Sequence, residues 1–150
     1  MRIVSGKYGG RLIKAPKDRA IRPTSDKVRG AVFNMLRSRG AVEGAQVVDC
    51  FCGTGALGLE ALSQGAAHCL FIDKNQEALA LAKANAAALG VREEAEFFLK
   101  DTTKLAQKPE KISAMNLIFL DPPYNKNIVP AALNILHNND WLAEGAMIVA

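Results

Sequence analysis

The 150-residue chain lacks any apolar run close to the roughly 20 residues that a membrane-spanning helix needs. Its first residues, MRIVSGK, also lack the apolar stretch of a signal peptide. Cysteine is scarce, because Cys50, Cys52 and Cys69 are the only three, and an odd number so placed makes no disulfide framework. These absences argue against a membrane-spanning or secreted protein, and we expect it in a reducing cytoplasm.

Linkers, repeats and metal-ligand patterns are also missing. No Gly/Ser-rich linker, internal repeat or low-complexity tract interrupts the chain, and its length fits one domain. Cys50-x-Cys52 has no second cysteine pair, and His68 and His137 lie elsewhere in the sequence, so we predict no metal site. Hydrophobic residues make up 49%, which is enough to build a core.

Positive charge is concentrated at the N-terminus. Residues 1–42 hold eleven Lys and Arg against two acidic residues, a net charge of +9, whereas residues 43–150 carry −5. Two interpretations stay open on charge alone: a solvated basic face, or an electrostatic footprint for a polyanion. The segment is not low in apolar residues, as a basic tail would be.

The basic segment predicts a hairpin and a helix. Residues 2–13 contain two short β-prone runs around a glycine-rich turn, which is typical of a β-hairpin. A basic loop follows from Pro16 to Pro23. Thr24 or Ser25 then caps a helix whose apolar positions recur at helical spacing as far as Leu36.

From residue 45 the sequence predicts alternating strands and helices. The predicted strands cover 46–49, 69–73, 95–99, 117–120 and 146–150. The predicted helices cover 56–63, 76–89 and 128–137. Continuous apolar strands that alternate with helices form a parallel sheet covered on both faces, so we predict a doubly wound α/β fold.

A glycine-rich turn follows the first of these strands. Gly53, Gly55 and Gly58 match G-x-G-x-x-G, a pattern that lets backbone approach a ligand at a helix N-terminus. The spacing fits a dinucleotide or S-adenosylmethionine (SAM). Asp49, just before the glycines, would repel a pyrophosphate and attract the ammonium and sulfonium of SAM, which favours SAM. The alternative is that Asp49 only caps the turn.

Acidic residues stand at the ends of four predicted strands. They are Asp49, Asp73, Asp101 and Asp121. Ligands of a doubly wound sheet bind outside the carboxyl ends of its strands, so four such residues predict one site rim. Asp73 is placed to bind ribose hydroxyls, and Asp101 is placed to accept a hydrogen bond from an adenine amino group.

The segment Asp121-Pro122-Pro123-Tyr124 follows the fourth strand. Two prolines hold the backbone extended, so that the Pro122 carbonyl and the Asp121 carboxylate can accept from one exocyclic amine of a planar base. Two acceptors orient the nitrogen lone pair toward a methyl donor, and the gain comes from positioning and electrostatics. The alternative is a simple strand-terminating turn.

These motifs together resemble the class I SAM-dependent methyltransferases that act on exocyclic amines of bases. Residues 3–11, 22–29 and 33–36 are similar to the N-terminal signature of the RsmD-type 16S ribosomal RNA (guanine-N2) methyltransferases, and residues 116–124 to their fourth-strand motif. The resemblance implies a Rossmann-like sheet of strand order 3-2-1-4-5. The chain departs from the family at Gly30 and Asn116, and it ends after the fifth strand, so we expect a C-terminally short member without the usual last two strands.

The resemblance also implies roles for individual residues. The residues implied to bind SAM are Asp49, Phe51, Gly53, Gly55, Asp73, Asp101 and Asn34. Asp121, Pro122 and Tyr124 are implied to hold a flipped guanine. The residues predicted to contact RNA are Arg2, Lys7, Arg11, Arg22 and Arg29. The expected substrate is 16S rRNA or a small-subunit assembly particle, bound by a monomer.

We therefore expect residues 1–42 to form an RNA-binding extension and residues 43–150 a SAM-binding core. Two other functions stay open. DNA adenine-N6 methylation uses the same Asp-Pro-Pro-Tyr chemistry, although the compact basic hairpin and the absence of a target-recognition domain favour RNA. The other is a module that binds SAM and RNA without turnover.

Overall fold

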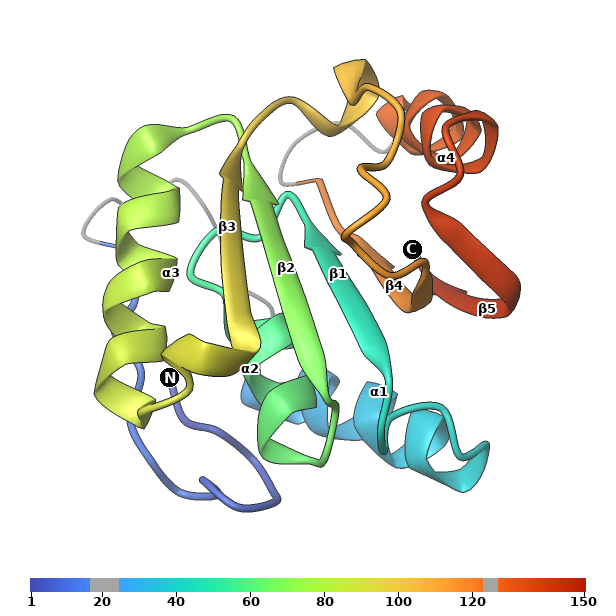
Figure 1. Ribbon diagram of the computed structural model, residues 1–150. Coiled ribbons are helices and arrows are strands. Elements are labelled where there is room, and N and C mark those ends of the chain that lie inside the picture. The colour runs from blue at the N-terminus through green and yellow to red at the C-terminus, as the bar shows by residue number, and fades with distance from the viewer. Residues whose placement is uncertain (17–24, 123–126) are drawn as a thin grey trace.

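The computed structural model describes residues 1–16, 25–122 and 127–150. Its centre is a five-stranded sheet of order β3-β2-β1-β4-β5 in which all neighbours run parallel (Figure 1). The strands are β1 (Gln46–Cys50), β2 (His68–Asp73), β3 (Ala95–Leu99), β4 (Met115–Leu120) and β5 (Leu142–Val149). The predicted doubly wound fold and its strand order are confirmed.

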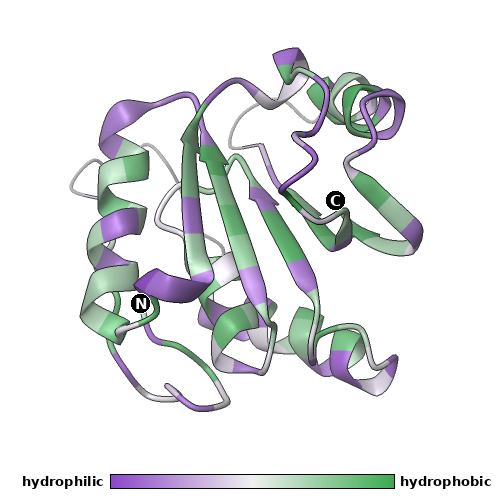
Figure 2. Cartoon of the chain, viewed as in Figure 1, coloured by the Kyte–Doolittle hydropathy of each residue, from purple (hydrophilic) through white to green (hydrophobic). Residues whose placement is uncertain are grey.

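Helices cover both faces of this sheet. They are α1 (Asp26–Ser38), α2 (Ala56–Ser63), α3 (Gln76–Leu89) and α4 (Ile128–Asn138), with short 3-10 turns η1 (Arg92–Glu94) and η2 (Thr102–Lys104). One hydrophobic cluster joins α1, α2 and α3 to one face, and a second joins α4 to the other. The central strands β1 and β2 are largely hydrophobic, as Figure 2 shows, because both of their faces are covered.

Capping residues set the helix ends at the predicted positions. The Ser25 side chain accepts from the Val28 N–H at 3.2 Å, and Asn75 accepts from Ala78 at 3.0 Å. Gly90, with φ +76°, ends α3 in the left-handed conformation. The predicted bounds of α2 and α3 match the structure residue for residue.

The last strand differs from its prediction because it contains an irregularity. It begins at Leu142 rather than at residue 146. Its pairing with β4 shifts register between Met115 and Leu117, and Gly145 lies on β5 at φ +73°. Such a bulge interrupts the apolar pattern by which a strand is recognised from sequence.

The N-terminal hairpin is confirmed as an antiparallel turn, but with one isolated bridge, Arg2 to Leu12, in place of a ladder. Ile3 and Ile13 are buried in the cluster shared with α1, α2 and α3. Phe33 of α1 packs on Phe119 of β4 with the ring centres 5.6 Å apart. Residues 1–42 thus share a core with the sheet, and their separation from residues 43–150 stays a proposal about function.

Two parts of the sequence predictions lie outside the described residues. They are the basic loop through Arg22, at residues 17–24, and the segment with Pro123 and Tyr124, at residues 123–126. Among the helices of the described ranges, none has the length and apolar character to cross a membrane.

Candidate active site

The carboxyl ends of β1, β2 and β4 lie side by side in the middle of the sheet. Cys50 pairs with Ile72 on one side and with Leu120 on the other, so Asp73 and Asp121 each follow a partner of Cys50. Asp73 itself pairs with Leu99 of β3, and Asp101 comes two residues later. The register therefore gathers three of the predicted carboxylates at one edge.

The turn after β1 is tightly wound and held by β2. Phe51, Gly53 and Gly55 all have positive φ, at +57°, +55° and +82°. A left-handed residue other than glycine costs about 1–2 kcal/mol, so neighbouring contacts must hold Phe51 in place. The Cys52 N–H donates to the Ile72 carbonyl at 3.0 Å, and the Gly53 N–H donates to Oδ2 of Asp73, also at 3.0 Å. The turn is thus anchored before any ligand arrives.

Asp49 lies beneath this turn and is almost completely buried, at 1% exposure. Its Oδ2 accepts from the Gly58 N–H in the first turn of α2 at 3.0 Å. Burial raises the pKa of the Asp49 carboxyl well above its usual range, the Gly58 hydrogen bond opposes this, and Asp121 and Asp73 add to it. The hydrogen bond shows the turn-capping role; direct contact of Asp49 with a cofactor stays a prediction.

Gly58 lets α2 approach the sheet closely. A Cβ at this position would lie 2.4 Å from Cε1 of Phe71 and 2.6 Å from Sγ of Cys69. Both of those side chains belong to β2, so the third glycine of the motif serves helix–strand packing.

The other two strand-end carboxylates organise their own loops. Asp73 accepts from Gly53 and, through Oδ1, from the Asn75 N–H at 2.9 Å. Asp101 accepts from both the backbone N–H and the hydroxyl of Thr103, at 3.0 and 2.7 Å. The Thr103 hydroxyl lowers the pKa of Asp101 despite partial desolvation. Their predicted contacts with ribose and adenine stay predictions.

The remaining predicted site residues fall in three settings. Asp121 is partly exposed and Pro122 is buried at the end of β4, next to the glycine turn. Asn34 is exposed on α1. Tyr124 lies outside the described residues.

One predicted RNA contact is wrong. Arg29 is fully buried, its Nε lies 3.1 Å from Oε1 of Glu60, and its NH2 lies 2.7 Å from Oδ1 of Asp26. The same guanidinium donates to the Arg2 carbonyl. An enclosed guanidinium paired with carboxylates cannot reach a phosphate, so Arg29 joins α1, α2 and the hairpin instead.

Glu60 is the partner that sequence reasoning missed. Its Oε1 accepts from the Val4 N–H at 2.8 Å and its Oε2 from the Ser5 N–H at 3.1 Å. The signal was a single charged residue inside the apolar run ALGLEALS of α2. Such a charge is stable in a core only when it is paired.

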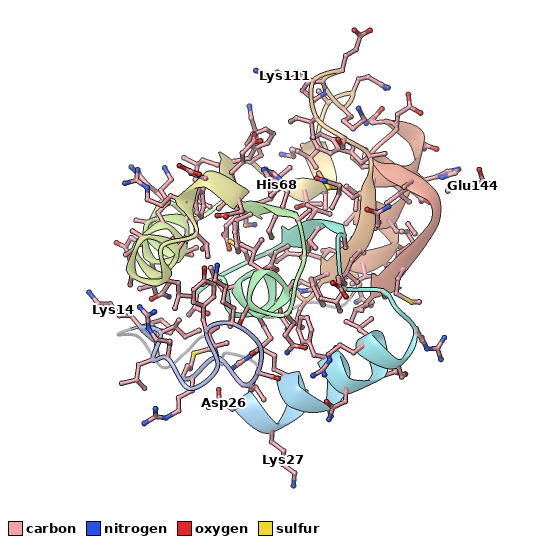
Figure 3. All side chains as sticks on the ribbon, turned by 60° about the horizontal axis from the view of Figure 1, so that its bottom comes forward. Lys14, Asp26, Lys27, His68, Lys111 and Glu144 are labelled. Carbon is pink, nitrogen blue, oxygen red and sulfur yellow. The ribbon has the colours of Figure 1, made fainter. Side chains whose placement is uncertain are left out.

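Several cations of the extension do face solvent. Arg2, Lys7 and Arg11 are exposed, although the guanidinium groups of Arg2 and Arg11 also donate to the carbonyls of Gly10 and Ala88. Figure 3 shows Lys14 and Lys27 projecting from the side that carries the hairpin and α1, while Lys111 lies on the far side. Arg22 lies outside the described residues.

The three cysteines are free and buried, and burial raises the pKa of each thiol above its usual range. A buried thiol of this kind is a poor nucleophile and a poor metal ligand. Within residues 1–16, 25–122 and 127–150, no three His, Cys, Asp or Glu side chains gather as a metal site would require.

A surface hollow of about 400 Å³ lies near the start of β4, away from the carboxylate edge. Arg39, Glu43, Asn116 and Met147 are among its lining residues. None of the predicted site residues in the described ranges lines it, so we assign it no part in the site.

Comparison with known proteins places the whole chain in one family. The model of the family described as "Conserved hypothetical protein 95" matches residues 1–150. The chain is 36% identical to "Putative rRNA methyltransferase YlbH" of Bacillus subtilis (strain 168), over 100% of this chain and 81% of that relative. It is also 36% identical to "Ribosomal RNA small subunit methyltransferase D" of Escherichia coli (strain K12), over 99% of this chain and 72% of the relative.

A solved structure agrees with these sequence relatives. It is "Putative methyltransferase yhhF from Escherichia coli", with a TM-score of 0.84 and 34% identity. The match covers 99% of this chain and 77% of that one.

Proposed function

The chain belongs to the family described as conserved hypothetical protein 95, and from this premise we propose that it methylates the exocyclic N2 of a guanine in 16S ribosomal RNA. The coarser statement stands on relatives named as rRNA methyltransferases: the chain is a SAM-dependent rRNA methyltransferase. The finer statement includes the base, the 16S RNA or its assembly particle, and action as a monomer in the cytoplasm. The strand-end chemistry supports its first part.

The observation that carries the choice of cofactor is the position of Asp49. A dinucleotide places its pyrophosphate on the free N–H groups of the helix that follows the glycine turn. In this chain Asp49 accepts the Gly58 N–H of that helix, and the Thr54 hydroxyl accepts the Ala56 N–H at 3.3 Å. A pyrophosphate would compete with an internal carboxyl group for the same donors, so a dinucleotide does not fit.

A cationic cofactor fits the residues present. Asp73, Asp101 and Asp121 gather at one edge, and carboxylates favour the ammonium and sulfonium of SAM. Gly53 faces open space, since a Cβ there would meet nothing within 4 Å, so backbone can approach a ligand closely. We propose that SAM is held by Asp49, Phe51, Gly53, Gly55, Asp73, Asp101 and Asn34.

When bound, SAM supplies an electrophilic methyl group. The chain's own part is to hold the amine. We propose that the Asp121 carboxylate and the Pro122 carbonyl accept the two N–H bonds of the guanine amine and turn its lone pair toward the methyl group. Asp121 is then placed to take up the proton that the amine loses. Tyr124 would stack on the base.

The extension supplies the surface for RNA. The exposed cations Arg2, Lys7 and Arg11 belong to a segment of net charge +9, and phosphate contacts dominate the affinity of proteins for RNA. We propose that these residues, together with Arg22, contact phosphates. Arg29 is not among them.

The test is an isosteric change at the amine acceptor. We expect Asp121→Asn to lower the rate of methyl transfer to 16S rRNA at least about a hundredfold, because one acceptor becomes a donor and the proton acceptor is lost. SAM affinity, measured by calorimetry, should stay within about threefold of the unchanged protein. Asp140→Asn, an exposed acid after α4, is the matched control and should transfer at the normal rate.

Full transfer by Asp121→Asn would contradict this role for Asp121. Duplex DNA serves as a second substrate, and methylation of its adenine in preference to rRNA would contradict the proposed base. SAM binding without transfer to either nucleic acid would contradict an enzyme and favour a binding module.

A further inference from the structure

A single buried amide connects the N-terminal extension to the glycine turn. Asn85 lies on the inward face of α3, with 2% exposure, in a row whose other members are Leu79, Ala82, Ala86 and Leu89. An amide in such a row costs free energy unless its hydrogen bonds are made. Its partners therefore explain its presence.

Those partners come from two distant segments. Oδ1 of Asn85 accepts from the Lys14 N–H at 2.8 Å, and Nδ2 donates back to the Lys14 carbonyl at 3.1 Å. The same Nδ2 donates to the Thr54 carbonyl at 3.0 Å. Lys14 belongs to the basic extension, and Thr54 is the central residue of the Gly53-Thr54-Gly55 turn.

The hydrogen bond to Thr54 fixes a peptide that would otherwise rotate easily. Thr54 lies between two left-handed glycines, and glycine has the widest backbone freedom of any residue. On the other side of the same peptide unit, the Gly55 N–H donates to the Cys52 carbonyl at 2.9 Å. Asn85 and Cys52 thus hold both polar groups of the peptide that links Thr54 to Gly55.

The other attachment of the extension does not reach the turn. Glu60 holds the backbone of Val4 and Ser5, but it lies in the second half of α2. Arg11 donates to Ala88 near the end of α3. Among the described residues, Asn85 is the side chain whose hydrogen bonds reach both Lys14 and the turn.

We propose that Asn85 is a positioning residue that couples cofactor binding to RNA binding. The identity of the two ligands rests on the proposed function. A cofactor that orders the turn fixes the Thr54 carbonyl, and through Asn85 it fixes the backbone of Lys14. RNA that then binds beside Lys14 loses less conformational entropy, so each ligand strengthens the binding of the other by the same factor.

The experiment compares RNA affinity with and without S-adenosylhomocysteine, using 16S rRNA transcribed in vitro. We expect the unchanged protein to bind this RNA about fivefold or more tightly when S-adenosylhomocysteine is present. Asn85→Asp keeps the acceptor for the Lys14 N–H but turns carboxylate oxygens toward the carbonyls of Lys14 and Thr54. Its affinity ratio should fall to about one. Asn134→Asp, on the exposed side of α4, should keep the full ratio.

A second measurement needs no variant. Hydrogen exchange of the Lys14 amide in the unchanged protein should slow when S-adenosylhomocysteine binds, because this amide donates to Asn85. A purely structural role of Asn85 would weaken both affinities and leave their ratio unchanged.

Three results would overturn the inference. The first is an Asn85→Asp protein with the full affinity ratio, and the second is a Lys14 amide whose exchange ignores the ligand. The third is an unchanged protein that binds both ligands with a ratio of one, which leaves the proposed function standing. Failure of the unchanged protein to bind either ligand would overturn the proposed function as well.

Discussion

Gly58 and Gly30 both lie in helices, but their surroundings give the same substitution opposite effects. We expect Gly58→Ala to destabilise the protein by about 1–3 kcal/mol, because the new methyl group would lie 2.4 Å from the Phe71 ring. Gly30→Ala should stabilise it by up to about 1 kcal/mol, since alanine favours helices and only Val4 Cγ1, at 3.4 Å, is near. Urea unfolding measures both.

The two glycine variants control for each other. Equal unfolding midpoints would contradict the close approach of α2 to β2. A Gly58→Ala protein that unfolds at the same urea concentration as the unchanged one would do so most directly.

At the residue scale, the sequence identifies chemistry better than exposure. The carboxylates at the strand ends were predicted, because strand ends can be recognised and the edge of the sheet follows from the fold. Arg29 was predicted as a phosphate contact, since nothing local distinguishes it from Lys27 two residues earlier. Its burial depends on Glu60, which is 31 residues away in sequence, and long-range pairs of this kind are not encoded in spacing.

At the scale of elements, the buried pair Arg29–Glu60 holds α1, α2 and the hairpin together. We expect Arg29→Met to destabilise the protein by about 3 kcal/mol or more, because the Glu60 carboxylate would stay buried without its cation. Arg37→Met, at an exposed position of the same helix, should change stability by about 0.5 kcal/mol or less. Thermal or urea unfolding of the three proteins provides the measurement.

An Arg29→Met protein as stable as the Arg37→Met protein would contradict this role. It would mean that hydrophobic contacts of Ile3 and Ile13 suffice to hold the hairpin.

Element type and order followed from hydrophobic pattern and caps. The bounds of α2 and α3 were predicted to the residue, since a glycine turn precedes α2, Asn75 caps α3 and Gly90 ends it. The start of β5 was missed, because Gly145 and the register shift break its apolar pattern. The hairpin was predicted without its single bridge, because its stability comes from packing on α2 and not from a ladder.

At the scale of the molecule, the basic extension predicts a salt-dependent affinity for RNA. Each phosphate contact with single-stranded RNA contributes about −0.7 to the slope of log K against log salt. We expect the triple change of Lys7, Lys14 and Lys27 to Ala to reduce that slope by about 2, while SAM affinity stays unchanged. Lys111→Ala, on the far side in Figure 3, is the control and should keep the slope.

Substitution is a cleaner test here than deletion of the N-terminal residues. Ile3 and Ile13 are part of the core, so removing the segment would also remove packing. A triple variant with an unchanged salt slope would show that these lysines form only a solvated face, and phosphate contacts would have to be sought elsewhere.

The central claim is that this chain methylates a guanine amine in small-subunit RNA. Nucleoside mass spectrometry tests it most directly, on 16S rRNA or its assembly particle incubated with the protein and isotopically labelled SAM. The account predicts labelled N2-methylguanine with the unchanged protein and none with Asp121→Asn. Label in any other nucleoside, or no label from a protein that binds SAM, would contradict it.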